Sequence, residues 1–138
     1  ECEDNHIQFT GMLGLDEMPL IYAAADLMLF PSYQENCPLA PIEAAACGLP
    51  VVFKDLPEYR LLYEHPYLKA NSTEEFIHLT RGLIDNAEAL QQAKMISEML
   101  IKQFDKSEVR DKLLNIYQYL YENNLQQENK EASTWQTI

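Results

Sequence analysis

Two glutamates eight positions apart, Glu35 and Glu43, are the residues whose type and setting could do chemistry. Glu35 follows the apolar run at 27–30, and Glu43 stands in the first turns of a small-residue segment, 41–47, that predicts a helix. A helix start offers free N–H groups and partial positive charge, which suit a diphosphate. A carboxylate accepts two hydrogen bonds at once and so fits a vicinal diol. One glutamate could therefore hold sugar hydroxyls and the other ribose hydroxyls, with the diphosphate between them.

The elements around these acids follow from hydrophobic patterning. Four strands are expected, over residues 7–11, 27–30, 50–53 and 67–70. Helices are expected over residues 16–25, 41–47, 56–64, 72–85, 87–104 and 107–123. Asp16 is the expected cap of the first helix, and Ser72 with Glu75 forms a capping box. Alternating strands and helices indicate an α/β fold with a parallel, Rossmann-like sheet flanked by helices and ending in a helical segment.

Charge and composition exclude several classes of function. The net charge is −12, from 22 acidic and 10 basic residues, which argues against nucleic acid and against a grip on an anionic membrane. No run of about 18 apolar residues predicts a transmembrane segment. The three cysteines form no CxxC pair, which fits a reducing compartment. The three histidines share no metal-ligand spacing, so we expect no metal.

The stretch from residue 30 to residue 52 carries a specific resemblance. It reads Phe-Pro-Ser-Tyr-Gln-Glu-Asn-Cys-Pro-Leu-Ala-Pro-Ile-Glu-Ala-Ala-Ala-Cys-Gly-Leu-Pro-Val-Val. This resembles the Glu–seven residues–Glu motif of retaining GT-B glycosyltransferases, close to the large family-four (group 1) set. The Phe-Thr-Gly at 9–11 and the Tyr-Ala-Ala-Ala-Asp at 22–26 resemble that family too. The similarity covers residues 7 to 60.

The resemblance implies a role for each residue of the motif. Glu35 is the implied catalytic residue and would contact the hydroxyls of the donor sugar. Backbone N–H groups of Asn36, Cys37 and Leu39 would line the sugar and the diphosphate, and Glu43 would hold the ribose. The implied activity is retaining transfer of a hexose from a nucleoside diphosphate, with a UDP-sugar such as UDP-glucose as the expected donor.

The resemblance also implies an incomplete enzyme. We expect residues 1–125 to be part of the C-terminal, donor-binding GT-B domain of a longer chain and residues 126–138 to be a disordered polar tail. Pro38 stands where many members have glycine, so one N–H donor is missing. The family's phosphate-activating Arg and Lys match no position here, so we expect this piece to be inactive without its N-terminal domain.

The resemblance implies no bound metal, because GT-B enzymes need none. It also implies no cofactor, because the nucleotide sugar is a substrate. The acceptor is unknown, with a lipid or glycan such as a bacterial glycolipid or cell-envelope acceptor expected. The full-length protein is expected in the cytoplasm, at the inner face of the membrane.

Two other functions remain open at this stage. A glycoside hydrolase could use Glu35 and Glu43 as acid and nucleophile, but such acids flank a scissile bond, and here both belong to one loop–helix unit. A non-catalytic nucleotide-sugar-binding or interaction module is the other alternative.

Lys54 follows a predicted strand and could approach a phosphate, although a strand-end lysine is usually solvated. Tyr33 could border the pocket or cover the core.

Overall fold

The computed structural model describes the backbone of residues 6–135 and the side chains of residues 6–125. The chain divides into two compact units, Glu1–Ile101 and Lys102–Ile138. The disordered tail predicted at 126–138 lies partly outside the residues whose backbone is described. Its side chains lie wholly outside the described ones.

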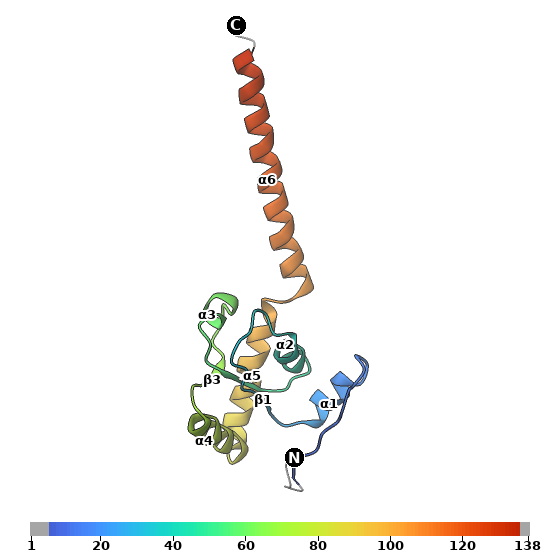
Figure 1. Ribbon diagram of the computed structural model, residues 1–138, viewed down its shortest axis with the longest axis vertical. Coiled ribbons are helices and arrows are strands. Elements are labelled where there is room, and N and C mark those ends of the chain that lie inside the picture. The colour runs from blue at the N-terminus through green and yellow to red at the C-terminus, as the bar shows by residue number, and fades with distance from the viewer. Residues whose placement is uncertain (1–5, 136–138) are drawn as a thin grey trace. The chain divides into compact units, whose positions relative to one another are not determined.

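The first unit is an α/β layer structure (Figure 1). Its elements, in order, are α1 (Met18–Ala24), β1 (Met28–Phe30), α2 (Leu39–Ala46), β2 (Val51–Lys54), α3 (Tyr59–Leu62), β3 (Leu68–Ala70), α4 (Thr73–Ile84) and α5 (Ala87–Lys102). The three strands form one parallel sheet in the order β1-β2-β3. The expected Rossmann-like fold with a parallel sheet flanked by helices is confirmed.

Strand β2 lies at the centre of the sheet and is buried along most of its length. Val51, Val52 and Phe53 are each 0–1% exposed. A strand that is paired on both edges and covered on both faces must be apolar at every position rather than at alternate ones. This explains why the continuous apolar run marked the strand correctly.

Helices α4 and α5 cover one face of the sheet. Val52 and Ala70 pack there against Leu83 of α4 and Ala93 of α5 in one buried cluster. Ser97 of α5 is also buried, and its hydroxyl accepts a hydrogen bond of 3.1 Å from the backbone N–H of Val51. A polar atom of α5 thus satisfies the first backbone donor of the central strand.

An aromatic cluster is built around Phe53, whose side chain points to the opposite face from that of Val52. Its ring centroid lies 5.4–5.5 Å from those of Tyr59, Tyr63 and Tyr67. Burial raises the pKa of Tyr59 and of Tyr67 to about 12 and also raises that of Tyr63. The Tyr59 hydroxyl has no hydrogen-bond partner among the described residues.

The predicted strand at 7–11 is wrong. These residues have no strand structure, and Phe9 is 83% exposed. The alternation of apolar residues is present, but a strand exists only where a neighbour satisfies its backbone groups, and no described segment pairs with this one.

Several helix boundaries also differ from the prediction. Helix α3 covers only four residues instead of the predicted 56–64, and Pro57, which disfavours helical geometry in the residue before it, accounts for the later start. Asp16 does not cap α1, which is preceded by Glu17. The Ser72 hydroxyl does accept from the Glu75 N–H at 3.2 Å, but the Glu75 carboxylate accepts from the Asn71 N–H rather than from Ser72.

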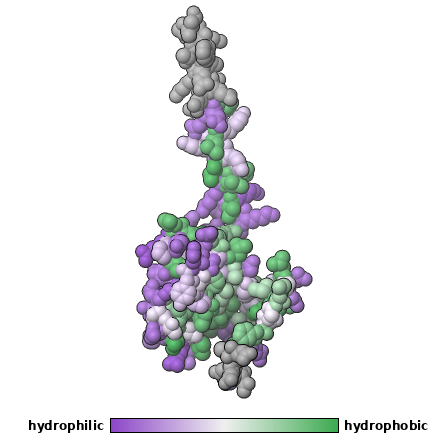
Figure 2. Space-filling model, viewed as in Figure 1, coloured by the Kyte–Doolittle hydropathy of each residue, from purple (hydrophilic) through white to green (hydrophobic). Residues whose placement is uncertain are grey.

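The second unit contains helix α6 (Lys106–Trp135), which continues beyond the predicted end at residue 123. The sequence after residue 105 contains no Gly or Pro that would stop it. Its apolar and tyrosine side chains are exposed, including Leu113, Leu120 and Tyr121 at 49%, 51% and 65%. Green and purple patches alternate along this helix in Figure 2.

Within the described residues, no helix combines the length and the hydropathy that a membrane span requires.

Replacing Ser97 by alanine should lower the free energy of unfolding by about 1–3 kcal/mol, because it leaves the buried Val51 N–H without an acceptor. Urea unfolding of the protein measures this change. The exposed neighbour Glu98 is the control, and Glu98→Ala should change stability by less than about 0.5 kcal/mol. Equal stability of Ser97→Ala and the parent protein would contradict the role assigned to this bond.

Replacing Tyr59 by phenylalanine should raise the free energy of unfolding by about 1 kcal/mol at neutral pH, because it removes a buried hydroxyl that lacks a partner. The raised pKa means that the folded state resists ionisation of this phenol, so stability is lost as the pH rises from about 10, the value in the unfolded chain, towards about 12.

Tyr59→Phe should therefore lose less stability than the parent over that pH range, as followed by denaturant unfolding at each pH. Tyr33 is 86% exposed, so Tyr33→Phe is the control and should match the parent. A destabilised Tyr59→Phe protein at neutral pH would show that the hydroxyl is satisfied after all.

Candidate functional site

The loop of residues 31–38 leaves the carboxyl end of β1 and leads directly into α2. In a parallel sheet this edge is where ligands bind. Glu35 lies in the middle of the loop and is half-buried, while Asn36 and Cys37 beside it are exposed. The loop thus presents one partly shielded carboxylate and two accessible backbone positions at the ligand edge of the sheet.

Glu35 lies close enough to the aromatic cluster to act on it electrostatically. After burial, which is the largest cause, the negative charge of Glu35 contributes to the raised pKa of Tyr59 and of Tyr63. The protonated phenols and the carboxylate therefore share one environment.

The N-terminus of α2 has no side-chain cap. Pro38 occupies the cap position and is buried, and the first turn contains no acidic residue. Pro41 in that turn has no N–H, so the backbone donors left at the helix start are those of Leu39 and Ala40. Leu39 is 64% exposed, which leaves this end of the helix accessible. Such a start, with its partial positive charge, suits an anion.

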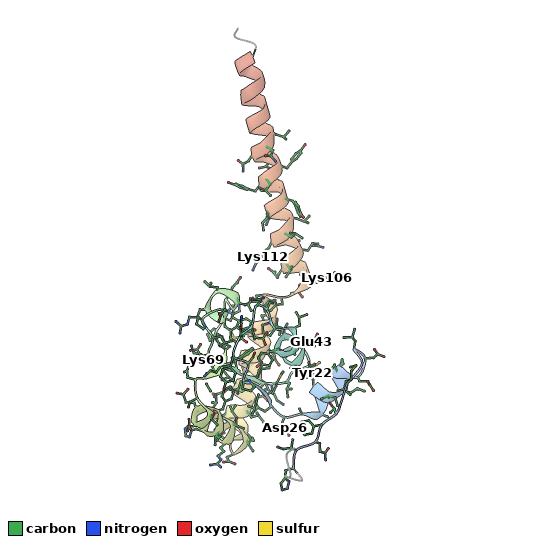
Figure 3. All side chains as sticks on the ribbon, in the orientation of Figure 1. Tyr22, Asp26, Glu43, Lys69, Lys106 and Lys112 are labelled. Carbon is green, nitrogen blue, oxygen red and sulfur yellow. The ribbon has the colours of Figure 1, made fainter. Side chains whose placement is uncertain are left out.

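Glu43 lies one turn further along α2 and is held by a tyrosine from α1. The Tyr22 hydroxyl donates to a carboxylate oxygen of Glu43 at 3.3 Å, and Figure 3 shows the two side chains side by side. Tyr22 is 6% exposed, whereas Glu43 is exposed. Burial, and then the charge of Glu43, raise the pKa of Tyr22, so the phenol remains a hydrogen-bond donor at physiological pH.

No role for Tyr22 is predicted from the sequence, although the Tyr-Ala-Ala-Ala-Asp segment that contains it is part of the family resemblance. The structure brings Tyr22 and Glu43 together from positions 21 residues apart. The spacing of apolar residues in α1 indicates that Tyr22 is buried. It does not indicate which residue of α2 Tyr22 contacts.

Asp55, at the carboxyl end of β2, is already fully engaged. It pairs with Lys69 at 3.1 Å and Arg60 at 3.9 Å, and it accepts a 3.1 Å hydrogen bond from the Tyr67 hydroxyl. Burial opposes ionisation of this carboxyl, but these hydrogen bonds and charges outweigh it and lower its pKa. Asp55 therefore links Tyr67 of the aromatic cluster to the edge of the sheet. We do not expect it to contact a ligand.

The two predicted acids have different neighbours. The charge of Glu35 acts on Tyr59 and Tyr63, whereas Glu43 accepts a hydrogen bond from Tyr22 of α1. The accessible start of α2 lies between them in the chain. Among the side chains of residues 6–125, no group of three or more Cys, His, Asp and Glu residues could hold a metal ion.

Comparisons with known proteins identify the family. Residues 1–86 match the family described as Glycosyl transferases group 1. No solved structure matches the chain.

Three relatives illustrate the similarity. Alpha-galactosylglucosyldiacylglycerol synthase of Streptococcus pneumoniae is 28% identical over 118 residues, which is 86% of this chain and 32% of the relative. D-inositol 3-phosphate glycosyltransferase of Salinispora arenicola is 54% identical over 37 residues, 27% of this chain and 8% of the relative. O-antigen chain mannosyltransferase B of Escherichia coli is 38% identical over 55 residues, 38% of this chain and 14% of the relative.

The chain spans about a third of the length of the Streptococcus pneumoniae relative and less of the other two. The family match includes α1, β1, the loop with Glu35, α2 and both remaining strands. The chain belongs to the group 1 glycosyl transferases.

Proposed function

We propose that this chain supplies the donor-binding part of a retaining glycosyltransferase that transfers a hexose from a nucleoside diphosphate sugar, with a UDP-sugar as the donor. Membership of the family supports glycosyl transfer. The observation that carries donor binding is the accessible, uncapped start of α2 between two glutamates at the carboxyl edge of a parallel sheet.

In this proposal the diphosphate binds at the start of α2. The N–H groups of Leu39 and Ala40 point along the helix axis towards it, and the helix adds partial positive charge. Asn36 and Cys37 offer further backbone donors from the exposed part of the loop. The missing N–H of Pro38 removes one donor, but Pro38 also fixes the backbone at the helix start and so limits the entropy lost on binding.

Glu43 is proposed to hold the ribose diol. The Tyr22 hydrogen bond occupies one carboxylate oxygen, which orients the group and leaves lone pairs for two sugar hydroxyls. A pre-oriented carboxylate loses less side-chain entropy on binding than a free one.

Glu35 is proposed to contact the hydroxyls of the transferred sugar and to act in catalysis. Glu35 is half-buried, and its charge acts on Tyr59 of the aromatic cluster. The retaining outcome, the Arg and Lys that would activate the leaving diphosphate, and an N-terminal domain for the acceptor are all parts of the proposal that the family resemblance suggests.

We propose a glycolipid acceptor. A relative that aligns with 86% of this chain is named alpha-galactosylglucosyldiacylglycerol synthase. A lipid acceptor and a nucleotide donor meet naturally at the cytoplasmic face of a membrane, which is the location we propose.

Replacing Glu43 by glutamine in the full-length protein should weaken UDP binding by about tenfold or more, because a charge-assisted hydrogen bond to the ribose is lost. Isothermal titration with UDP measures this. Glu98→Gln, an exposed acid on α5, is the matched control and should bind UDP as the parent does. Full-length protein that binds neither UDP nor UDP-glucose would refute donor recognition.

Tyr22→Phe should weaken UDP binding less than Glu43→Gln, because it removes the residue that orients the carboxylate and leaves the carboxylate itself. An effect larger than that of Glu43→Gln would mean that Tyr22 touches the donor directly.

Glu35→Gln should reduce kcat for transfer by at least about tenfold while UDP affinity stays within about twofold of the parent value, because its contacts are made to the sugar and not to the nucleotide. Steady-state kinetics together with UDP titration separate the two effects. Glu58→Gln, an exposed acid at the start of α3, serves as the control. Unchanged kcat in Glu35→Gln would remove Glu35 from catalysis.

A further inference from the structure

Lys54 is a half-buried cation at the carboxyl end of the central strand β2. Its ammonium donates a hydrogen bond to the backbone carbonyl of Asn71, which follows the end of β3. The same ammonium lies 6.0 Å from the centre of the Tyr33 ring. The Lys54 side chain, from the end of β2, thus contacts both the residue after β3 and the loop that carries Glu35.

The charge of Lys54 is not neutralised by a carboxylate within the part of the chain that the structure describes. The ion pairs Arg60–Asp55, Lys69–Asp55 and Arg110–Asp111 do not include it. The adjacent Asp55 is occupied by two other cations and a tyrosine hydroxyl. An ammonium has three N–H donors, and the Asn71 carbonyl takes one of them.

Lys54 is also close to the proposed donor site. Tyr33, whose ring it approaches, precedes Glu35 by two residues in the same loop. The preceding residue, Phe53, contacts Tyr59, whose pKa responds to Glu35. Strands β1 and β2 are parallel neighbours, so their carboxyl ends deliver the loop and Lys54 to the same edge.

We infer that Lys54 binds an anionic oxygen of the donor, with the Tyr33 ring as one wall of this subsite. The inference rests on the donor binding proposed above. A cation without a carboxylate partner, held by one carbonyl at the ligand edge of a strongly acidic chain, is placed to attract a nucleotide sugar. The anionic oxygen belongs either to the diphosphate or to a carboxylate on the transferred sugar.

The contacts of Lys54 could alternatively serve only to fix the Glu35 loop. That role needs a hydrogen-bond donor and a group above the ring, but it does not need a positive charge. Glutamine at position 54 keeps a donor for the Asn71 carbonyl and removes the charge, whereas arginine keeps the charge. The two substitutions therefore separate anion binding from loop positioning.

The test is titration of the full-length protein and its Lys54→Gln and Lys54→Arg variants with UDP, UDP-glucose and UDP-glucuronate at two salt concentrations. Lys94→Gln is the matched control, because Lys94 is also half-buried but lies on α5. Thermal unfolding verifies that each variant is folded.

Lys54→Gln should bind the donor about tenfold more weakly and lose part of the salt dependence, while Lys54→Arg and Lys94→Gln stay near the parent values. An equal loss for all three ligands assigns the oxygen to the diphosphate, and a loss for UDP-glucuronate alone assigns it to a sugar carboxylate.

Unchanged affinities and salt dependence in Lys54→Gln would overturn the inference while leaving donor binding intact. Equal losses in Lys54→Gln and Lys54→Arg with unchanged salt dependence would overturn it in favour of loop positioning. Parent protein that binds none of the three ligands would refute the proposed function itself.

Discussion

The burial of strand β2 is the constraint on which the rest of the first unit depends. Its side chains form the contact between the α4–α5 layer on one face and the aromatic cluster on the other, and its backbone pairs with both neighbours. The same strand ends at Lys54 and is followed directly by Asp55. Interior packing and the polarity of the ligand edge are therefore set by one short segment, in which three apolar residues are followed directly by two charged ones.

Much of this fold could be predicted because its signals are local. The apolar runs marked three strands, and the small-residue segment marked α2. The prediction failed at residues 7–11, where pairing depends on a partner that the pattern itself does not reveal. It also failed where a single backbone property overrides hydrophobicity, as Pro57 does at the start of α3.

The sequence predicts the acids of the candidate site but not their environment. The spacing of Glu35 and Glu43 and the helix start between them lead to this prediction, and the roles of the two acids stay predictions. The neighbours of the acids come from distant positions: Tyr22 of α1 donates a hydrogen bond to Glu43, and Tyr59, which follows β2, responds to the charge of Glu35. Such contacts depend on how helices and strands pack against one another, and this packing cannot be predicted directly from a single sequence.

Strand β1 has one neighbour among the described residues, β2, and Leu29 on it is 46% exposed. The other edge of β1 therefore presents unsatisfied backbone groups, beside a shallow apolar groove that Pro31, Phe76 and Ile77 help to line. A segment that paired with this edge would also immobilise the strand from which the Glu35 loop departs. Completion of the sheet and the affinity for a ligand at its edge would then be thermodynamically linked, each strengthening the other.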